Sequence, residues 1–157
     1  MPTGPGDVLV TGASGFIGRA LVRRLAAQGH PPVCTARHPV EDLVGGARWI
    51  PGDLTDPGFV TRLVAEARPT VVYHLASAVT GNRSLEWVRT TLASNLTAGV
   101  NLLQAVTEAG CDRVVLTGSC DEPEDGAAPC SPYAAAKWAL GGYARMFRSL
   151  YGTPVTT

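Results

Sequence analysis

The stretch Thr11-Gly12-Ala13-Ser14-Gly15-Phe16-Ile17-Gly18 follows an apolar, β-branched run at residues 7–11 and precedes a segment with helical periodicity. The apolar residues that recur at helical spacing are Ile17, Ala20, Leu21 and Leu25. The stretch is therefore predicted to be the turn between a buried strand and an amphipathic helix. Glycines at this spacing permit a tight turn, close approach of a phosphate to the backbone and close packing of the helix on the sheet. The pattern favours dinucleotide binding, and the alternative is an ordinary strand–helix turn.

The rest of the chain alternates apolar runs typical of strands with patterns typical of helices. Strands are expected over 32–36, 48–50, 70–76 and 113–117, and helices over about 57–67, about 85–109 and from Tyr133 to about Leu150. The long second helix is expected to bury Val88, Leu92, Leu96, Val100, Leu103 and Val106. This alternation predicts an α/β fold, a Rossmann-type doubly wound parallel sheet with helices on both faces.

Ligands of such sheets bind outside the carboxyl ends of the strands. The residues expected at or just beyond those ends are Gly12, His74, Thr117, Ser119 and Tyr133. Their convergence on one edge predicts a site there.

On a helix, Tyr133 and Lys137 share a face. The ordinary pKa of a phenol is about 10, and a positive charge beside it favours its ionised form. A surface helix pair is the alternative for these two residues.

The composition suits one domain with a core and excludes several partner classes. The chain has 157 residues, of which 45% are apolar, and its thirteen basic and thirteen acidic residues cancel. Nothing here indicates nucleic acid or an anionic membrane surface as a partner. No run approaches the ~20 apolar residues of a membrane span, and no signal peptide is evident, so a cytoplasmic protein is expected. The four cysteines (Cys34, Cys111, Cys120 and Cys130) lack metal-ligand spacing; reduced thiols and no metal site are expected, with a Cys120–Cys130 disulfide as the minor alternative.

Six stretches, in this order, resemble the extended short-chain dehydrogenase/reductase superfamily, which holds nucleotide-sugar epimerases, dehydratases and reductases. After the glycine turn they are Gly52-Asp53-Leu54, His74-Leu75-Ala76, residues 94–103 with Asn95, Thr117-Gly118-Ser119 and Pro132-Tyr133-Ala134-Ala135-Ala136-Lys137. The resemblance covers essentially the whole chain. It implies one dinucleotide-binding domain over residues 1–157 that carries the catalytic residues, with the carboxy-terminal substrate domain missing after residue 157. Because relatives begin a sixth strand where this chain ends, the fifth strand is expected to have an unpaired edge.

The resemblance assigns roles to residues. Tyr133 would exchange a proton with the substrate hydroxyl or carbonyl, Ser119 would hold that oxygen, and Lys137 would also bind the nicotinamide ribose. Asp53 would approach the adenine, while His74 would brace the end of its strand and Asn95 would be structural or bind a water near the lysine. The complete set expected to bind the cofactor is Gly12, Ser14, Gly15, Phe16, Ile17, Gly18, Arg37, Asp53, Leu54, Leu75, Ala76, Ser77, Asn95, Thr117, Tyr133 and Lys137.

The end of the second strand bears on the choice of cofactor. NAD-specific members carry an acid there that binds the adenosine ribose, whereas this chain has Thr35-Ala36-Arg37-His38-Pro39. Arg37 suits a 2′-phosphate, so NADP(H) is favoured. NAD(H) stays open if Arg37 only covers the adenine.

The favoured function is an NAD(P)-dependent oxidoreductase acting on a nucleotide-activated sugar, most simply a 4-ketoreductase. The alternatives are a nucleotide-sugar epimerase or dehydratase, a reductase of flavonoid or steroid ketones, and a non-catalytic dinucleotide sensor. Retention of Ser119, Tyr133 and Lys137 argues against the sensor. Asp121 and Glu122 follow Ser119 and are either dehydratase-like acids or loop residues. The resemblance also implies a homodimer paired through the long helix and the Tyr133 helix, unless their apolar residues face the core.

Overall fold

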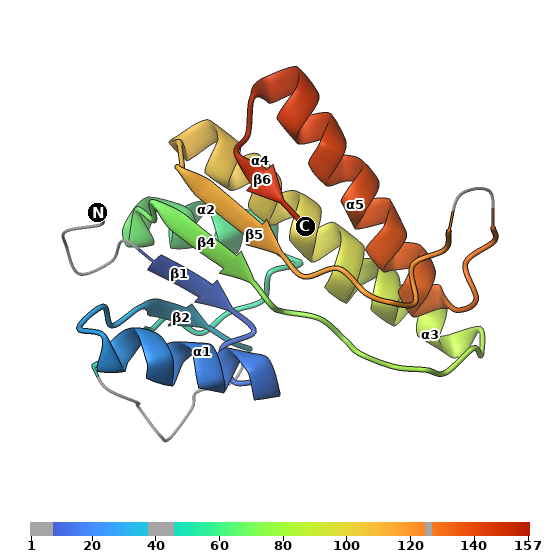
Figure 1. The fold of residues 1–157 in the computed structure, drawn as a ribbon, viewed down its shortest axis with the longest axis horizontal. Helices are drawn as coiled ribbons and strands as arrows, with labels where there is room; N and C mark the ends of the chain where they lie inside the picture. Colours follow the sequence, from blue (N-terminus) through green and yellow to red (C-terminus); the bar gives the residue numbers. More distant parts are fainter. Residues whose placement is uncertain (1–7, 38–45, 125–126) are drawn as a thin grey trace.

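The computed structural model describes residues 8–37, 46–124 and 127–157 (Figure 1). Within them, six parallel strands form one sheet in the order β3-β2-β1-β4-β5-β6. The strands are β1 (Val8–Thr11), β2 (Val33–Thr35), β3 (Arg48–Trp49), β4 (Val71–His74), β5 (Arg113–Leu116) and β6 (Val155–Thr156). The predicted doubly wound parallel sheet is thus confirmed, and the strand order reverses between β1 and β4.

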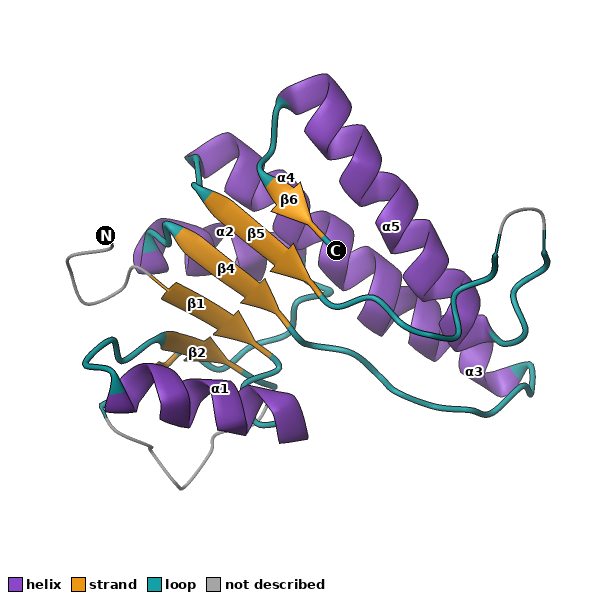
Figure 2. Ribbon diagram, in the orientation of Figure 1, coloured by secondary structure: helices purple, strands orange, loops and turns teal. Residues whose placement is uncertain are grey.

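Helices cover both faces of this sheet, as Figure 2 shows. They are α1 (Phe16–Ala27), α2 (Pro57–Ala67), α3 (Glu86–Thr91), the π-helical segment η1 (Leu92–Thr97), α4 (Ala98–Ala109) and α5 (Pro132–Tyr151). The bounds of α2 match the prediction. Its start follows from its sequence, because Asp56 accepts the N–H of Gly58 at 2.9 Å and Pro57 occupies the first helical position.

The alternation of side chains along β1 divides the core into two layers. Leu9 belongs to the larger cluster, which includes buried residues of α2, α4 and α5, whereas Val8 and Val10 pack in a smaller cluster with Val22 of α1. All four residues of β1 are buried, as a central parallel strand requires. By the same alternation, Thr11 lies on the face of the sheet that α4 and α5 cover.

The first helix does not bury all of the apolar residues that recur at helical spacing along it. Gly18 and Val22 are buried, whereas Ile17 is 61% exposed and Ala20 is also exposed. The reason is steric: a Cβ at Gly18 would lie 2.2 Å from the carbonyl oxygen of Gly12, so the helix touches the turn through its glycine. The helix itself is present as predicted, and its close contact with the turn is made by Gly18 rather than by Ile17 or Ala20.

The long helix predicted over 85–109 is interrupted by the π-helical segment η1. Val88 and Leu92 are 42% and 49% exposed, so their predicted burial is wrong, whereas Leu103 and Val106 are buried as predicted. Two features explain the difference. Figure 1 shows that α3 lies past the carboxyl ends of the strands, and a π-helical turn holds more residues than an α-helical one, which shifts the buried face.

The carboxy-terminal residues form a short strand, β6, beside β5. Val155 and Thr156 pair with Val114 and Val115, so the expectation of an unpaired fifth strand is wrong. The chain reaches this position because Gly152, at φ 70°, ends α5 in a left-handed conformation. The side chain of the buried Thr153 then lies 2.7 Å from the hydroxyl of Thr107 on α4.

Among the described residues, no helix is both long and apolar enough to cross a bilayer. The same ranges hold no group of three or more His, Cys, Asp or Glu side chains arranged for a metal ion. Cys34, Cys111, Cys120 and Cys130 are free thiols, and burial raises the pKa of Cys34 to about 12.

Candidate functional site

A groove opens at the carboxyl ends of the strands, where the strand order reverses. Its walls come from the glycine turn, the end of β2, and the loops after β3 and β4, and two residues of the η1–α4 helix complete it. The lining residues are Gly12, Ser14, Gly15, Thr35, Ala36, Arg37, Gly52, Asp53, Leu54, Thr55, Leu75, Ala76, Ser77, Ala78, Ser94 and Ala98.

Many of the predicted cofactor-binding residues line this groove, and several lining residues were not predicted. Ser94 and Ala98 are the clearest omissions, since they lie in a helix rather than at a strand end. Their spacing of four within the matched 94–103 stretch could have identified them as one face of a helix. The side chain of Phe16 is 96% exposed and is not among the lining residues, so its predicted contact with the cofactor stays a prediction.

The glycine turn leaves the backbone bare where it meets the groove. Gly12 has φ +65°, and a Cβ there would lie 2.5 Å from the backbone nitrogen of Ala76. The turn closes through the N–H of Gly15, which donates to the carbonyl of Gly12 at 3.0 Å. No side chain caps the start of α1. Because the first N–H groups of a helix lack intrahelical acceptors, they are free to bind an anion, and this cradle fits a pyrophosphate.

Arg37 and Asp53 define the end of the groove near β2 and β3. Both side chains are exposed, and Asp53 Oδ1 accepts the N–H of Thr55 at 2.9 Å. That hydrogen bond, aided by the charge of Arg37 and opposed by partial burial, lowers the pKa of Asp53. The described end of β2 offers no carboxylate. His38 and Pro39, which follow Arg37 in the sequence, lie outside the described residues.

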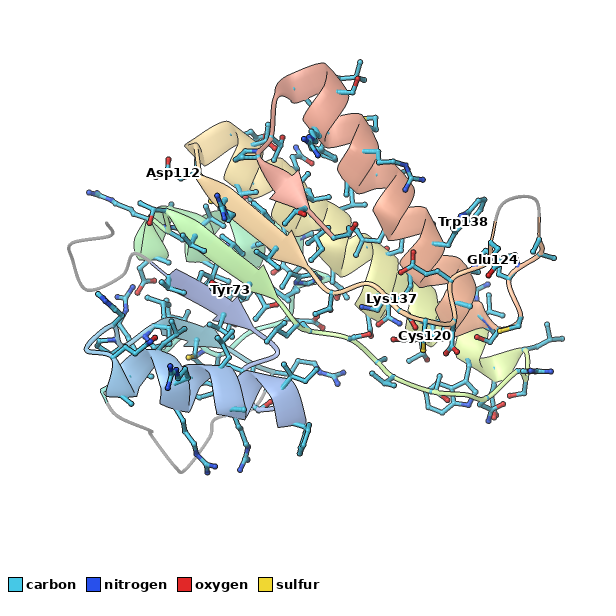
Figure 3. The ribbon with its side chains drawn as sticks, viewed as in Figure 1. Tyr73, Asp112, Cys120, Glu124, Lys137 and Trp138 are labelled. Atoms are coloured by element: carbon cyan, nitrogen blue, oxygen red, sulfur yellow. The ribbon has the colours of Figure 1, made fainter. Side chains whose placement is uncertain are left out.

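The predicted catalytic pair is buried at the start of α5, beyond the end of β5. Lys137 and Tyr133 are 4% and 7% exposed, and the ammonium lies 6.0 Å from the centre of the phenol ring. Lys137 Nζ donates to the carbonyl of Thr117 at 2.9 Å, which directs it toward the segment after β5 (Figure 3). Burial lowers the pKa of Lys137, and the negative charge of Glu122 opposes this effect.

Ser119 is held by the two acidic residues that follow it. Its N–H donates to Glu122 Oε1 at 2.7 Å, and its hydroxyl oxygen accepts the N–H of Asp121 at 3.1 Å. A Cβ at Gly118 would come within 3.0 Å of that Glu122 oxygen, so glycine leaves space for the carboxylate. Glu122 thus fixes the backbone of Ser119, a role that the sequence left open. No hydrogen bond joins Ser119 to Tyr133 among the described residues, and the serine proton stays available for a substrate oxygen.

His74 ties the ends of two central strands together. Its Nδ1 lies 2.7 Å from the hydroxyl of Thr11, and that hydroxyl also accepts the N–H of Ala76 at 3.3 Å. The ring is fully buried, and its Nε2 has no partner among the described residues. Burial, together with the charge of Lys137, lowers the pKa of His74 to about 3. The imidazole is therefore neutral at physiological pH.

Asn95 lies in the π-helical segment and is 1% exposed. Its amide oxygen accepts the N–H of Ala78 at 2.6 Å and the hydroxyl of Ser77 at 3.2 Å, while its amide nitrogen donates to the carbonyl of Ala78 at 3.1 Å. The side chain therefore holds the loop after β4, which is one wall of the groove. No direct hydrogen bond joins it to Lys137 in the described part of the chain.

Comparison with known proteins identifies the class to which this fold and site belong. The profile of the NAD dependent epimerase/dehydratase family matches residues 8–157, and the chain belongs to that family. The UDP-glucose 4-epimerase of Mycolicibacterium smegmatis is 35% identical over 91% of this chain and 51% of its own length. The dTDP-glucose 4,6-dehydratase of Xanthomonas campestris pv. campestris is 30% identical over 95% of this chain and 51% of its own length.

Solved structures agree with this classification. The UDP-glucose 4-epimerase of Thermus thermophilus in complex with NAD superposes with a TM-score of 0.83 at 32% identity, covering 94% of this chain and 52% of that one. MoeE5 in complex with UDP-glucose and NAD gives a TM-score of 0.78 at 30% identity, covering 96% of this chain and 52% of that one. The chain thus spans about half the length of these relatives.

The buried imidazole predicts a specific loss of stability in acid. Because the pKa of His74 is lower in the folded than in the unfolded chain, only the unfolded chain takes up this proton as the pH falls below about 6.5. Between pH 7.5 and 5 this should cost about 2 kcal/mol of unfolding free energy, measured by urea unfolding. His74→Gln should remove that portion of the pH dependence, whereas the exposed His30→Gln should keep it. Equal pH dependence in wild type and His74→Gln would contradict the assignment.

Proposed function

We propose that this chain is the dinucleotide-binding and catalytic half of a nucleotide-sugar 4-epimerase. The observation that carries the proposal is the buried Tyr133–Lys137 pair beyond the end of β5, with 6.0 Å between the ammonium nitrogen and the ring centre. The groove at the same edge of the sheet supports it, although Tyr133 and Lys137 are not among its lining residues. Membership in the epimerase/dehydratase family and likeness to two UDP-glucose 4-epimerases support it. The proposal replaces the 4-ketoreductase that the sequence favours, because the relatives that the chain matches include epimerases and a dehydratase.

The proposed chemistry divides among three side chains. When bound, NAD supplies the group that takes a hydride from the sugar carbon and returns it. Tyr133 takes the proton of the sugar hydroxyl as that bond becomes a carbonyl, and gives the proton back when the alcohol reforms. Lys137 holds its positive charge 6.0 Å from the centre of the Tyr133 ring, where it would offset negative charge that develops on the reacting oxygens. Ser119 donates a hydrogen bond from its hydroxyl to the same substrate oxygen and keeps its proton, while its own oxygen accepts the N–H of Asp121.

In this proposal the substrate site is completed by a part of the longer protein that lies outside this chain. The relatives are about twice the length that this chain covers. A carboxy-terminal substrate domain would follow β6 and close the site over Ser119 and Tyr133. UDP-glucose is the proposed substrate, because UDP-glucose 4-epimerases recur among the relatives.

The decisive test is the substitution Tyr133→Phe in the full-length protein. Loss of the only group proposed to move the proton should lower the rate of interconversion of UDP-glucose and its 4-epimer by about 10²–10⁴-fold. Binding of NAD, measured by calorimetry, should stay within about twofold, because the ring and its packing remain.

The exposed Tyr151→Phe at the end of the same helix is the matched control and should keep full activity. Equal rates for the two variants would refute the role of Tyr133. A wild-type protein that reduces a 4-keto sugar with consumption of a stoichiometric reductant, and does not epimerise, would instead support the ketoreductase.

The proposed cofactor is NAD, with Arg37 determining how well the 2′-phosphate of NADP is accepted. The family description and the NAD complexes of relatives favour NAD, whereas the absence of a carboxylate at the described end of β2 favours NADP(H). Arg37→Ala should weaken binding of NADP about tenfold and leave NAD within about twofold, since a charge-assisted hydrogen bond contributes about 1.5–3 kcal/mol. Arg23→Ala, an exposed arginine on α1, should change neither affinity. Unchanged binding of NADP to Arg37→Ala would show that Arg37 does not contact the phosphate.

The proposed assembly is a homodimer through the outer surface of α3, η1 and α5, which pack against one another. Exposed large apolar residues lie on these elements, at Val88, Leu92, Trp138 and Tyr143, and at Leu85 just before α3. Such exposure is typical of an interaction surface. The variant with Leu92→Arg and Trp138→Arg should sediment as a monomer, because two charges would be buried at the contact. Ile17→Arg, on the opposite layer of the molecule, should stay dimeric. A monomeric wild type would refute this assembly.

A further inference from the structure

The loop after β3 forms the wall of the groove beside Arg37. The lining residues of this loop are Gly52, Asp53, Leu54 and Thr55. The N–H of Gly52 donates to the carbonyl of Ala36, just after β2, at 3.0 Å and so anchors the loop there. Leu54 is 8% exposed and packs in the larger apolar cluster. Apolar packing of Leu54 determines how deeply the loop is buried. It is non-directional, so the orientation of the peptide groups in the loop must come from hydrogen bonds.

Asn101, on α4, supplies that polar contact from behind the wall. Its Nδ2 donates to the carbonyl of Leu54 at 3.0 Å and to the carbonyl of Thr55 at 3.2 Å. The side chain is half-buried and does not itself line the groove. Asn101 therefore contacts the wall on the side away from any ligand.

One planar peptide group connects Asn101 to Asp53. The carbonyl of Leu54 and the N–H of Thr55 belong to the same trans peptide unit, so they point in opposite directions. Asn101 binds the carbonyl end of this unit, and Asp53 Oδ1 accepts its N–H at 2.9 Å. The direction in which Asn101 holds the peptide thus determines where the Asp53 carboxylate finds its donor.

The same helix also holds the opposite wall. Asn95, six positions earlier, binds the backbone of Ala78 in the loop after β4, and Ser94 and Ala98, close to it on the helix, line the groove. The η1–α4 helix therefore fixes both walls relative to one another. In this arrangement Asn95 holds the β4 wall, and Asn101 holds the wall expected to meet the adenosine half, where Arg37 and Asp53 lie.

We infer that Asn101 is a positioning residue for the adenosine half of the dinucleotide: it orients the Leu54–Thr55 peptide and, through it, the Asp53 carboxylate. The inference rests on the proposed dinucleotide binding. Asn101 contacts no ligand, so its effect should pass through Asp53 and reach only ligands that carry adenosine.

Asn101→Leu in the full-length protein tests this role, because leucine keeps the volume and lacks the donor. The dissociation constant of ADP should rise about tenfold, which corresponds to about 1.4 kcal/mol, while that of reduced nicotinamide mononucleotide should stay within about twofold. In an Asp53→Asn background the same substitution should add less than about twofold to the dissociation constant of ADP. Thr107→Val is the matched control, since Thr107 also joins α4 to a neighbouring segment, at Thr153, but far from the groove lining.

Three outcomes would overturn the inference: unchanged binding of ADP, equal weakening of both ligands, or an undiminished loss in the Asp53→Asn background. A second readout does not depend on ligand binding. Loss of the oriented Thr55 N–H should raise the pKa of Asp53 in Asn101→Leu, measured by carbon NMR of the carboxyl group. A wild-type protein that binds neither ligand refutes the proposed function but not the role of Asn101. In that case the pKa of Asp53 tests the role: if the pKa does not rise in Asn101→Leu, the role of Asn101 is refuted. Asn101→Ala serves for both readouts if the leucine variant does not fold.

Discussion

Direct backbone-to-backbone packing at the first turn is the constraint on which the site depends. The glycine at position 12 touches the start of the loop after β4, and the glycine at position 18 touches the carbonyl of Gly12, in both cases with no space for a Cβ. Because these contacts involve main chain, neighbouring side chains cannot relax to accommodate a larger residue. The turn, the start of α1 and the loop after β4 are therefore held as one rigid unit at the point where the strand order reverses. The rest of the groove is built outward from this unit.

A second level of organisation is the electrostatic balance beyond the end of β5. Burial disfavours the charge of Lys137, and the structure offsets this with the carbonyl of Thr117 and the nearby carboxylate of Glu122. The same carboxylate binds the N–H of Ser119, so one side chain serves two proposed catalytic residues. His74 adds no charge here, since its buried ring stays neutral. Thr117 and Glu122 thus favour the charge of the ammonium that lies 6.0 Å from the centre of the Tyr133 ring.

The sequence predicts the parts of this protein that follow from local patterns. The glycine turn, the alternation of strands and helices and the bounds of α2 follow from residue spacing, and the family follows from the resemblance of six stretches to known members. Local patterns do not predict features that depend on tertiary packing. Ile17 is exposed because Gly18 makes the contact with the turn, and Val155 forms a strand because it pairs with the edge of β5. The roles of Glu122 and Asn101 could not be predicted, because each depends on a hydrogen bond to a backbone group whose direction only the folded chain defines.

The π-helical segment has a consequence for how one helix can serve two environments. Each residue of an α-helix advances the side chain by about 100°, so one extra residue in a turn rotates everything before it by about that angle. Asn95 can thereby face inward to the loop after β4 while Val88 and Leu92, earlier on the same rod, face solvent. Deletion of one residue from η1 would restore a regular α-helical turn, and the side chains of α3 would then follow the same helical phase as those of α4. Because the wider turn changes the helical phase, the residues that hold the groove and the exposed apolar residues face different directions on one continuous helix.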